Sequence, residues 1–134
     1  MNHDVDSPRT LIMHGGMHKT GTSAIQKFLH EELDHPKFEY FTVGKANSSL
    51  IVLECFHRRL AQLPHYPAEK FTNNDLVRRG ENARKRFMRR MRETTKENVV
   101  LSAESFTLLD RDECADFFDV VSESFSTVKL VLYV

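Results

Sequence analysis

The 134-residue sequence predicts an α/β fold, with a mostly parallel sheet flanked by helices in three layers. Two observations lead to this prediction. Short apolar runs that are typical of strands alternate with longer stretches in which apolar residues recur every three or four positions, as on one face of a helix. A glycine-rich loop also joins the first predicted strand to the first predicted helix. Strands that alternate with helices imply right-handed crossovers, and therefore parallel neighbours in the sheet.

Four apolar runs are predicted strands: residues 10–14, 38–43, 98–101 and 128–134. Gly15 and Gly16 close the first run, whose continuous apolar character suits a strand that is buried on both faces. The last run is the most apolar, and the sequence stops on it without a cap or a polar tail. A domain rarely ends on its strongest core strand. We therefore expect residues 1–134 to be the N-terminal part of a single domain, incomplete at the C-terminus.

Four helices are predicted between these strands, each with apolar residues on one face. These residues are Ile25, Phe28, Leu29 and Leu33 in a helix that starts at Thr22; Leu53, Phe56, Leu60 and Leu63 in a helix with Asn47 or Ser48 as its N-cap; Leu76, Ala83, Phe87 and Met91 within residues 74–96; and Cys114, Phe117, Phe118, Val121 and Phe125 in the last. Pro36 ends the first helix, because the residue before a proline avoids the helical region.

The composition argues against several classes of partner. Nineteen basic and 19 acidic residues give a net charge of zero, so no overall field draws the chain to nucleic acid or to anionic lipid. No apolar run approaches the ~20 residues that span a bilayer, and residues 1–9 lack the apolar segment of a secretory signal. Cys55 and Cys114 are therefore expected to be reduced thiols in the core, and the chain is expected in the cytoplasm.

The segment that carries chemistry is the loop of residues 15–23, GGMHKTGTS, between the first strand and the first helix. A helix N-terminus offers unpaired N–H groups and about half a positive charge, so it attracts anions. Glycines allow the backbone to approach such an anion closely. Lys19 adds a positive charge, and the hydroxyls of Thr22 and Ser23 add donors. This pattern predicts a P-loop-type domain that binds a phosphorylated donor.

The spacing of this loop differs from that of nucleotide hydrolases. A Walker A loop reads G-x-x-x-x-G-K-[ST]. Gly16 and Gly21 keep the glycine spacing, but Thr22 follows Gly21 where that motif has its lysine, and Lys19 precedes Gly21 instead. The lysine that would reach the β- and γ-phosphates is thus displaced, which argues against ATP or GTP hydrolysis.

With its lysine in this position, the run from His18 to Ser23 resembles the 5′-phosphosulfate loop of sulfotransferases that use 3′-phosphoadenosine-5′-phosphosulfate, and residues 13–25 look like the bacterial branch of that family. The resemblance implies that His18, Lys19, Thr20, Gly21, Thr22 and Ser23 form the donor site. Lys19 would neutralise the oxygen that bridges phosphorus and sulfur. The family's Arg and Ser for the 3′-phosphate would lie beyond Val134.

Glu104 is the candidate catalytic base. It follows the third predicted strand at the carboxyl edge of the sheet, where open α/β folds place their ligands, and sulfotransferases generally carry a His or Glu near this edge. The alternative is a carboxylate near a helix start, exposed to solvent or paired with Lys or Arg. Ser102 and Ser105 are expected to be helix caps. The arginines of residues 78–92 are expected to form a solvated face, with a rim that attracts anions as the alternative.

The predicted function is transfer of a sulfuryl group from 3′-phosphoadenosine-5′-phosphosulfate to a hydroxyl or amine of a small-molecule or glycan acceptor. No histidine pair has helical i, i+4 spacing with a carboxylate, so no metal is expected. One alternative is a P-loop nucleotide-dependent kinase, which would need Mg²⁺ and an Asp after an apolar strand. The other is a non-catalytic fragment that binds adenosine phosphates.

Overall fold

The computed structural model describes residues 8–16 and 22–133. Within these ranges the elements follow the alternating order that the sequence predicts. Their bounds are β1 Thr10–Gly16, α1 Thr22–Glu32, β2 Phe38–Tyr40, α2 Ser49–Phe56, η1 Leu60–Gln62, α3 Asn73–Glu93, β3 Asn98–Ser102, η2 Glu104–Leu108, α4 Arg111–Val121 and β4 Thr127–Tyr133, where η denotes a 3₁₀ helix.

The four strands form one parallel sheet in the order β2-β3-β1-β4. β1 pairs with β3 on one side and with β4 on the other, and His14 is in register with Ser102 and Val131. The carboxyl ends of β1 and β3 therefore meet at the same edge of the sheet, as the sequence predicts. The α/β class and the parallel sheet are thus confirmed.

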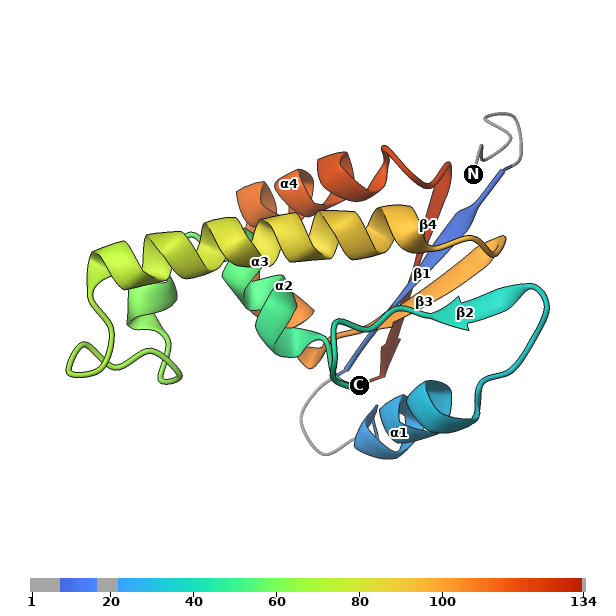
Figure 1. Cartoon of the computed structure of the whole chain (residues 1–134), viewed down its shortest axis with the longest axis horizontal. Coiled ribbons are helices and arrows are strands. Elements are labelled where there is room, and N and C mark those ends of the chain that lie inside the picture. The colour runs from blue at the N-terminus through green and yellow to red at the C-terminus, as the bar shows by residue number, and fades with distance from the viewer. Residues whose placement is uncertain (1–7, 17–21, 134) are drawn as a thin grey trace.

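Helices cover both faces of the sheet, as Figure 1 shows: α2, α3 and α4 lie on one face and α1 lies on the other. The main core fills the space between the sheet and the first three of these helices. Its largest fully buried side chains include Phe41, Phe56, Phe87 and Phe117. Phe117 is central among them, with ring centroids of Phe56 and Phe106 each 5.2 Å from its own.

The longest helix, α3, is the element that the sequence predicts best. It begins with a capping box, in which the Asp75 N–H donates to Thr72 Oγ1 and the Thr72 N–H donates to the Asp75 carboxylate. The predicted apolar stripe is confirmed, since its buried residues are Leu76, Ala83, Phe87 and Met91. The helix packs closely on α2 through this stripe and Gly80, where an added Cβ would lie 3.1 Å from the Glu54 carbonyl oxygen.

Several predicted helices differ in detail from the structure. Phe125, which the sequence places in the last helix, lies beyond α4, because that helix ends at Val121. The helix around residue 53 ends at Phe56, because His57 is extended, and only a 3₁₀ turn follows it. The prediction of a single helical face from Leu53 to Leu63 is therefore wrong. Ser48 occupies the N-cap position of α2, but its side chain makes no capping hydrogen bond. Instead, Asn47 Oδ1 accepts from the Ser49 N–H at 2.9 Å.

The contact of α1 with the sheet includes a buried polar side chain. Among the α1 side chains from residue 24 onward, Gln26 is the buried one, with 2% of its surface exposed, whereas Phe28 is 59% exposed. Ile25, Leu29 and Leu33 are half-buried. The expected apolar seam of this helix is therefore only partly covered, and a hydrogen-bonded contact lies at its centre.

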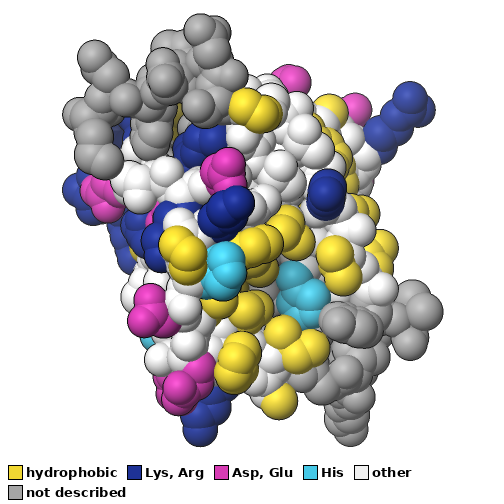
Figure 2. Space-filling model, turned by 90° about the vertical axis from the view of Figure 1, so that its right-hand side faces the viewer, with side chains coloured by type: hydrophobic (Ala, Val, Ile, Leu, Met, Phe, Trp, Pro, Cys, Tyr) yellow, Lys and Arg dark blue, Asp and Glu magenta, His cyan; other side chains and the backbone are white. Residues whose placement is uncertain are grey.

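The last strand, β4, lies at an edge of the sheet. Among the described residues its one strand neighbour is β1. Leu130, Val131 and Leu132 are 40–48% exposed, so the strand with the most apolar sequence is not a core strand in the described part of the chain. Figure 2 looks onto the side of the molecule that carries α1, and hydrophobic side chains gather there around histidines.

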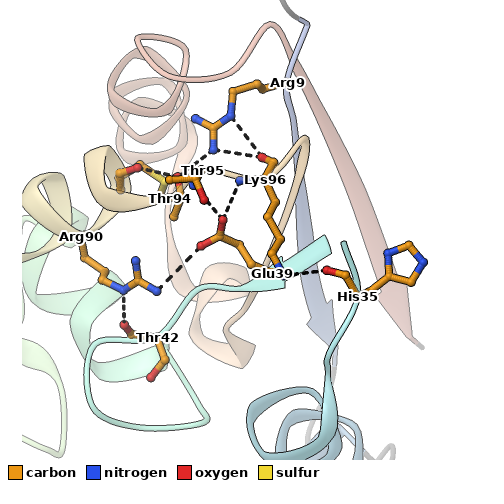
Figure 3. Close-up of polar contacts among 9 residues, drawn as sticks. Arg9, His35, Glu39, Thr42, Arg90, Thr94, Thr95 and Lys96 are labelled. Carbon is orange, nitrogen blue, oxygen red and sulfur yellow. Dashed lines mark hydrogen bonds and ion pairs between the residues drawn. The ribbon is translucent and has the colours of Figure 1, made fainter. Parts of the chain in front are cut away.

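A polar network holds together the end of the sheet at which the strands begin (Figure 3). Arg9, just before β1, donates to the Lys96 carbonyl and to Thr94 Oγ1 at the end of α3. Glu39 of β2 accepts from the N–H groups of Thr95 and Lys96 at 2.8 and 2.7 Å. These contacts join β1, β2 and the α3–β3 connection at the end of the sheet that is remote from the carboxyl ends of β1 and β3.

Cys55 and Cys114 are both free thiols, as the sequence predicts. Cys55 is buried in the core, where burial raises its pKa to about 12, whereas Cys114 is only half-buried against that core. Across residues 8–16 and 22–133, none of the helices has the length and apolar character needed to cross a membrane.

Candidate functional site

The candidate site lies at the carboxyl edge of the sheet, beyond the ends of β1 and β3. The predicted donor residues His18, Lys19, Thr20 and Gly21 fall outside the described residues, and so does the loop they form. On either side of it, Gly16 ends β1 and Thr22 and Ser23 begin α1. The predicted strand before this segment and the predicted helix after it are therefore both present.

Glu104 begins η2, two residues after β3 ends at Ser102. The Ala103 N–H donates to the His14 carbonyl at 2.9 Å, which continues the β1–β3 contact up to this point. Glu104 is half-buried and lines a cavity of about 630 Å³ between η2 and the start of α2. The structure thus brings the predicted base to the edge at which β1 ends. Because Lys19 is outside the described residues, the proximity of Glu104 to Lys19 stays a prediction.

The start of α2 is fixed to the same edge. The Ser48 N–H donates to the Ser102 carbonyl at 2.9 Å. Ser49 Oγ accepts from the Ser105 N–H at 3.1 Å, and Ser105 Oγ donates to the Ser49 carbonyl at 2.7 Å. Ser105 lies inside η2, whose N-cap residue is Ala103, so the prediction that Ser105 caps a helix is wrong. These bonds hold Glu104 and the α2 N-terminus in fixed positions on either side of the cavity.

A buried polar cluster, formed by His14, Ser102, Gln26 and Tyr40, lies between α1 and the sheet. Ser102 Oγ is 2.7 Å from His14 Nδ1, and Gln26 Nε2 donates to the same oxygen at 2.9 Å. Tyr40 also interacts with Ser102, and its hydroxyl donates to the Ala46 carbonyl. The prediction that Ser102 caps a helix is wrong, because Ser102 ends a strand and joins that strand to α1.

The cluster affects its titratable members in opposite ways. Burial lowers the pKa of His14, and the nearby Glu104 carboxylate partly opposes this by favouring the imidazolium. Burial raises the pKa of Tyr40 to about 12, which a hydrogen bond from Ser102 partly offsets. Both side chains are therefore neutral near pH 7, so the α1–sheet contact holds no buried charge from either of them.

The lowered pKa of His14 predicts a pH-dependent stability. Because the unfolded chain binds a proton to this histidine at higher pH than the folded one, the free energy of unfolding should fall as the pH drops from about 7.5 to about 5.5. Urea unfolding followed by circular dichroism at several pH values measures this slope. His14→Gln should flatten it. An unchanged slope in that variant would assign the effect to another group.

This cluster was not predicted from the sequence. His14 and Ser102 are polar residues at the ends of two apolar strands, and that position is the signal that could have identified them. Gln26 and Tyr40 give no such signal, because their burial depends on the face to which α1 docks. In the described part of the chain, no group of three or more His, Cys, Asp or Glu side chains is arranged to hold a metal ion.

The arginine-rich face of α3 is only partly a free solvated face. Arg84 binds Asp116 of α4 with two hydrogen bonds, of 3.1 and 2.9 Å, and Arg79 lies 3.7 Å from Glu54 of α2. Arg90 donates to the Thr42 carbonyl and lies 4.0 Å from Glu39 (Figure 3). These three arginines join α3 to its neighbours.

Comparison with known proteins adds no assignment: no family model, curated protein or solved structure matches the chain.

Proposed function

We propose that this chain carries the donor-binding and base-bearing part of a sulfotransferase that uses 3′-phosphoadenosine-5′-phosphosulfate. The observation that carries the proposal is the sequence GGMHKTGTS, which begins with the last two residues of the inner strand β1 and ends with the first two residues of α1. Ligands of open α/β sheets bind at this edge, and a helix N-terminus there favours an anion. The polar cluster supports the proposal, since it fixes α1 one turn after its start.

In this proposal, the 5′-phosphate is held by Thr20, Gly21, Thr22 and Ser23, with His18 beside them. The acceptor oxygen attacks sulfur in line with the bond from sulfur to the bridging oxygen. That bond breaks, its electron pair stays on the 5′-phosphate, and adenosine 3′,5′-bisphosphate leaves. Lys19 stabilises the charge that develops on the bridging oxygen. Catalysis rests on this charge stabilisation and on positioning, without a covalent intermediate.

Glu104 takes the proton of the acceptor hydroxyl or amine in this scheme. Its support is its place: it follows β3 at the edge where β1 ends, and it lines the cavity beside α2. A base must come within about 2.6–3.2 Å of the proton-bearing atom, so the acceptor would bind in that cavity. The acceptor would be a small molecule or a glycan, and the location would be the cytoplasm.

A donor titration tests the proposal. By calorimetry, 3′-phosphoadenosine-5′-phosphosulfate should bind without Mg²⁺, and Gly21→Val should abolish binding because its side chain keeps the backbone away from the phosphate. Lys19→Ala should keep the fold and cost about 2–4 kcal/mol of transition-state stabilisation, or roughly 30- to 1,000-fold in rate.

Three outcomes separate the alternatives. Mg²⁺-dependent binding and cleavage of ATP would favour a kinase, although β3 leads to Glu104 and not to the Asp that a kinase needs. Donor binding without transfer to any acceptor would favour a non-catalytic adenosine-phosphate binder. No donor binding, or equal binding by Gly21→Val, would exclude the sulfotransferase proposal.

A further inference from the structure

The cavity that Glu104 lines has the size and surface of a small-molecule site. Its volume of about 630 Å³ falls within the range of about 300–1,000 Å³ that is usual for ligand pockets. Leu50, Leu53 and Leu108 provide apolar surface, and Glu104, Lys45 and His65 provide polar groups. We call it the η2 cavity.

The apolar lining of the η2 cavity is partly open to solvent. Leu108 of η2 is 52% exposed and Leu50 of α2 is 38% exposed, while Leu53 is buried. The two exposed leucines come from different elements and line the same cavity. An apolar segment of a ligand would cover both, and removing such surface from water contributes about 25 cal/mol per Å².

A smaller basic cavity adjoins the first one. Its volume is about 200 Å³, and it shares Lys45, Asn47 and Leu50 with the η2 cavity. Arg79 and Arg86 of α3 add two guanidinium groups to its wall, against the single carboxylate of Glu54. Arg79 is already paired with Glu54 at 3.7 Å. Of the described carboxylates, none forms an ion pair with Lys45 or Arg86.

The backbone adds to this positive potential. The basic cavity lies at the N-terminus of α2, whose first turn contains no acidic residue. Ser48, the N-cap residue, lines the cavity with its hydroxyl buried, and among the described residues that hydroxyl has no hydrogen-bond partner. Lys45, Arg86 and the helix N-terminus thus favour an anionic group at this position.

We infer that the acceptor is an anionic amphiphile that occupies both cavities. Its hydroxyl lies at Glu104, its apolar segment covers Leu50 and Leu108, and its anionic group lies between Lys45 and Arg86. The inference rests on the proposed function for the identity of the reaction, because the acceptor oxygen forms the new bond to sulfur while Glu104 takes its proton. The binding of the amphiphile itself depends only on the two cavities.

Two probes that differ in one group test the inference by calorimetry in the absence of donor. 10-Hydroxydecanoate should bind about tenfold more tightly than decane-1,10-diol, because only the first carries a carboxylate for charge-assisted contacts. The double variant Lys45→Ala/Arg86→Ala should reduce the affinity for 10-hydroxydecanoate to that for the diol and leave diol binding unchanged. Leu108→Glu should weaken both probes at least about tenfold, because it places a charge on the apolar wall.

Arg89→Ala is the matched control, since Arg89 is an exposed arginine of α3 outside both cavities. It should leave both affinities unchanged, and circular dichroism should show each variant folded. Equal affinity of the two probes for the wild-type chain, or no binding at millimolar concentration, would overturn the inference. If the chain binds the donor but neither probe, the inference about the acceptor is overturned and the proposed function is not. If the chain binds 10-hydroxydecanoate as expected but no donor, the two-cavity site is supported and the proposed function is refuted.

Discussion

Replacing Glu104 by Gln should lower turnover by roughly 10²- to 10⁴-fold and leave donor affinity unchanged. This range is typical of losing a general base, because glutamine keeps the size of the side chain but cannot accept the proton. Glu104 lies two residues beyond β3 and lines the η2 cavity, so its effect should fall on the reaction and not on donor binding. If it only stabilised the start of η2, the same change should cost about 1 kcal/mol of stability and little turnover.

The release of adenosine 3′,5′-bisphosphate at saturating donor, with 10-hydroxydecanoate as acceptor, measures this effect. Glu97→Gln is the control, because Glu97 is an exposed glutamate just before β3, at the amino-terminal edge of the sheet. It should keep wild-type turnover and affinity. If Glu104→Gln stays within about threefold of wild type while its donor affinity is intact, another group removes the proton.

Phe117→Ala should remove about 3–5 kcal/mol from the free energy of unfolding. The Phe117 side chain is fully buried, and its ring contacts those of Phe56, Phe106 and Phe118, with centroids 5.2–5.6 Å away. Removal leaves a cavity where α2, α4 and η2 meet. A domain of ordinary stability has about 5–15 kcal/mol in total, so the variant should be close to its unfolding limit.

Urea unfolding followed by circular dichroism gives both the midpoint and the slope of the transition. The neighbouring Phe118→Ala is the control, since it removes the same atoms from a ring that is 38% exposed. It should cost about 1 kcal/mol, the scale of a partly exposed aromatic contact. Equal losses for the two variants would show that Phe117 is not the centre of the core.

The elements that depend on local sequence were predictable. The α3 stripe is an example: Leu76, Ala83, Phe87 and Met91 recur at helical spacing, and each is buried in the structure. The parallel pairing of β1 with β3 followed from strands that alternate with helices. It placed Glu104 at the correct edge, because residues that follow parallel neighbours must lie together.

Contacts that depend on docking between elements were not predictable. The face of α1 is the clearest case, since helical spacing selected Phe28 for burial whereas the structure buries Gln26. Spacing shows which residues share a face, but not which face meets the sheet. Gln26 can be buried because Ser102 accepts its hydrogen bond, and Ser102 comes from a strand 76 residues away. The contact between His14 and Ser102 was not predictable for the same reason, because it joins side chains of two elements that are far apart in the sequence.

The strand order determines when the sheet can form during synthesis. β2 pairs only with β3 among the described strands, and β1 pairs with β3 and β4, so the first two strands do not pair with each other. Both must stay unpaired until residues 98–102 leave the ribosome, and β1 then closes loops of more than 80 residues. Contacts of such sequence separation form slowly, because the entropy of loop closure is lost before the contact stabilises the chain. Formation of the sheet therefore depends on β3, and a nascent chain that has not reached it has no strand pair from which the sheet could grow.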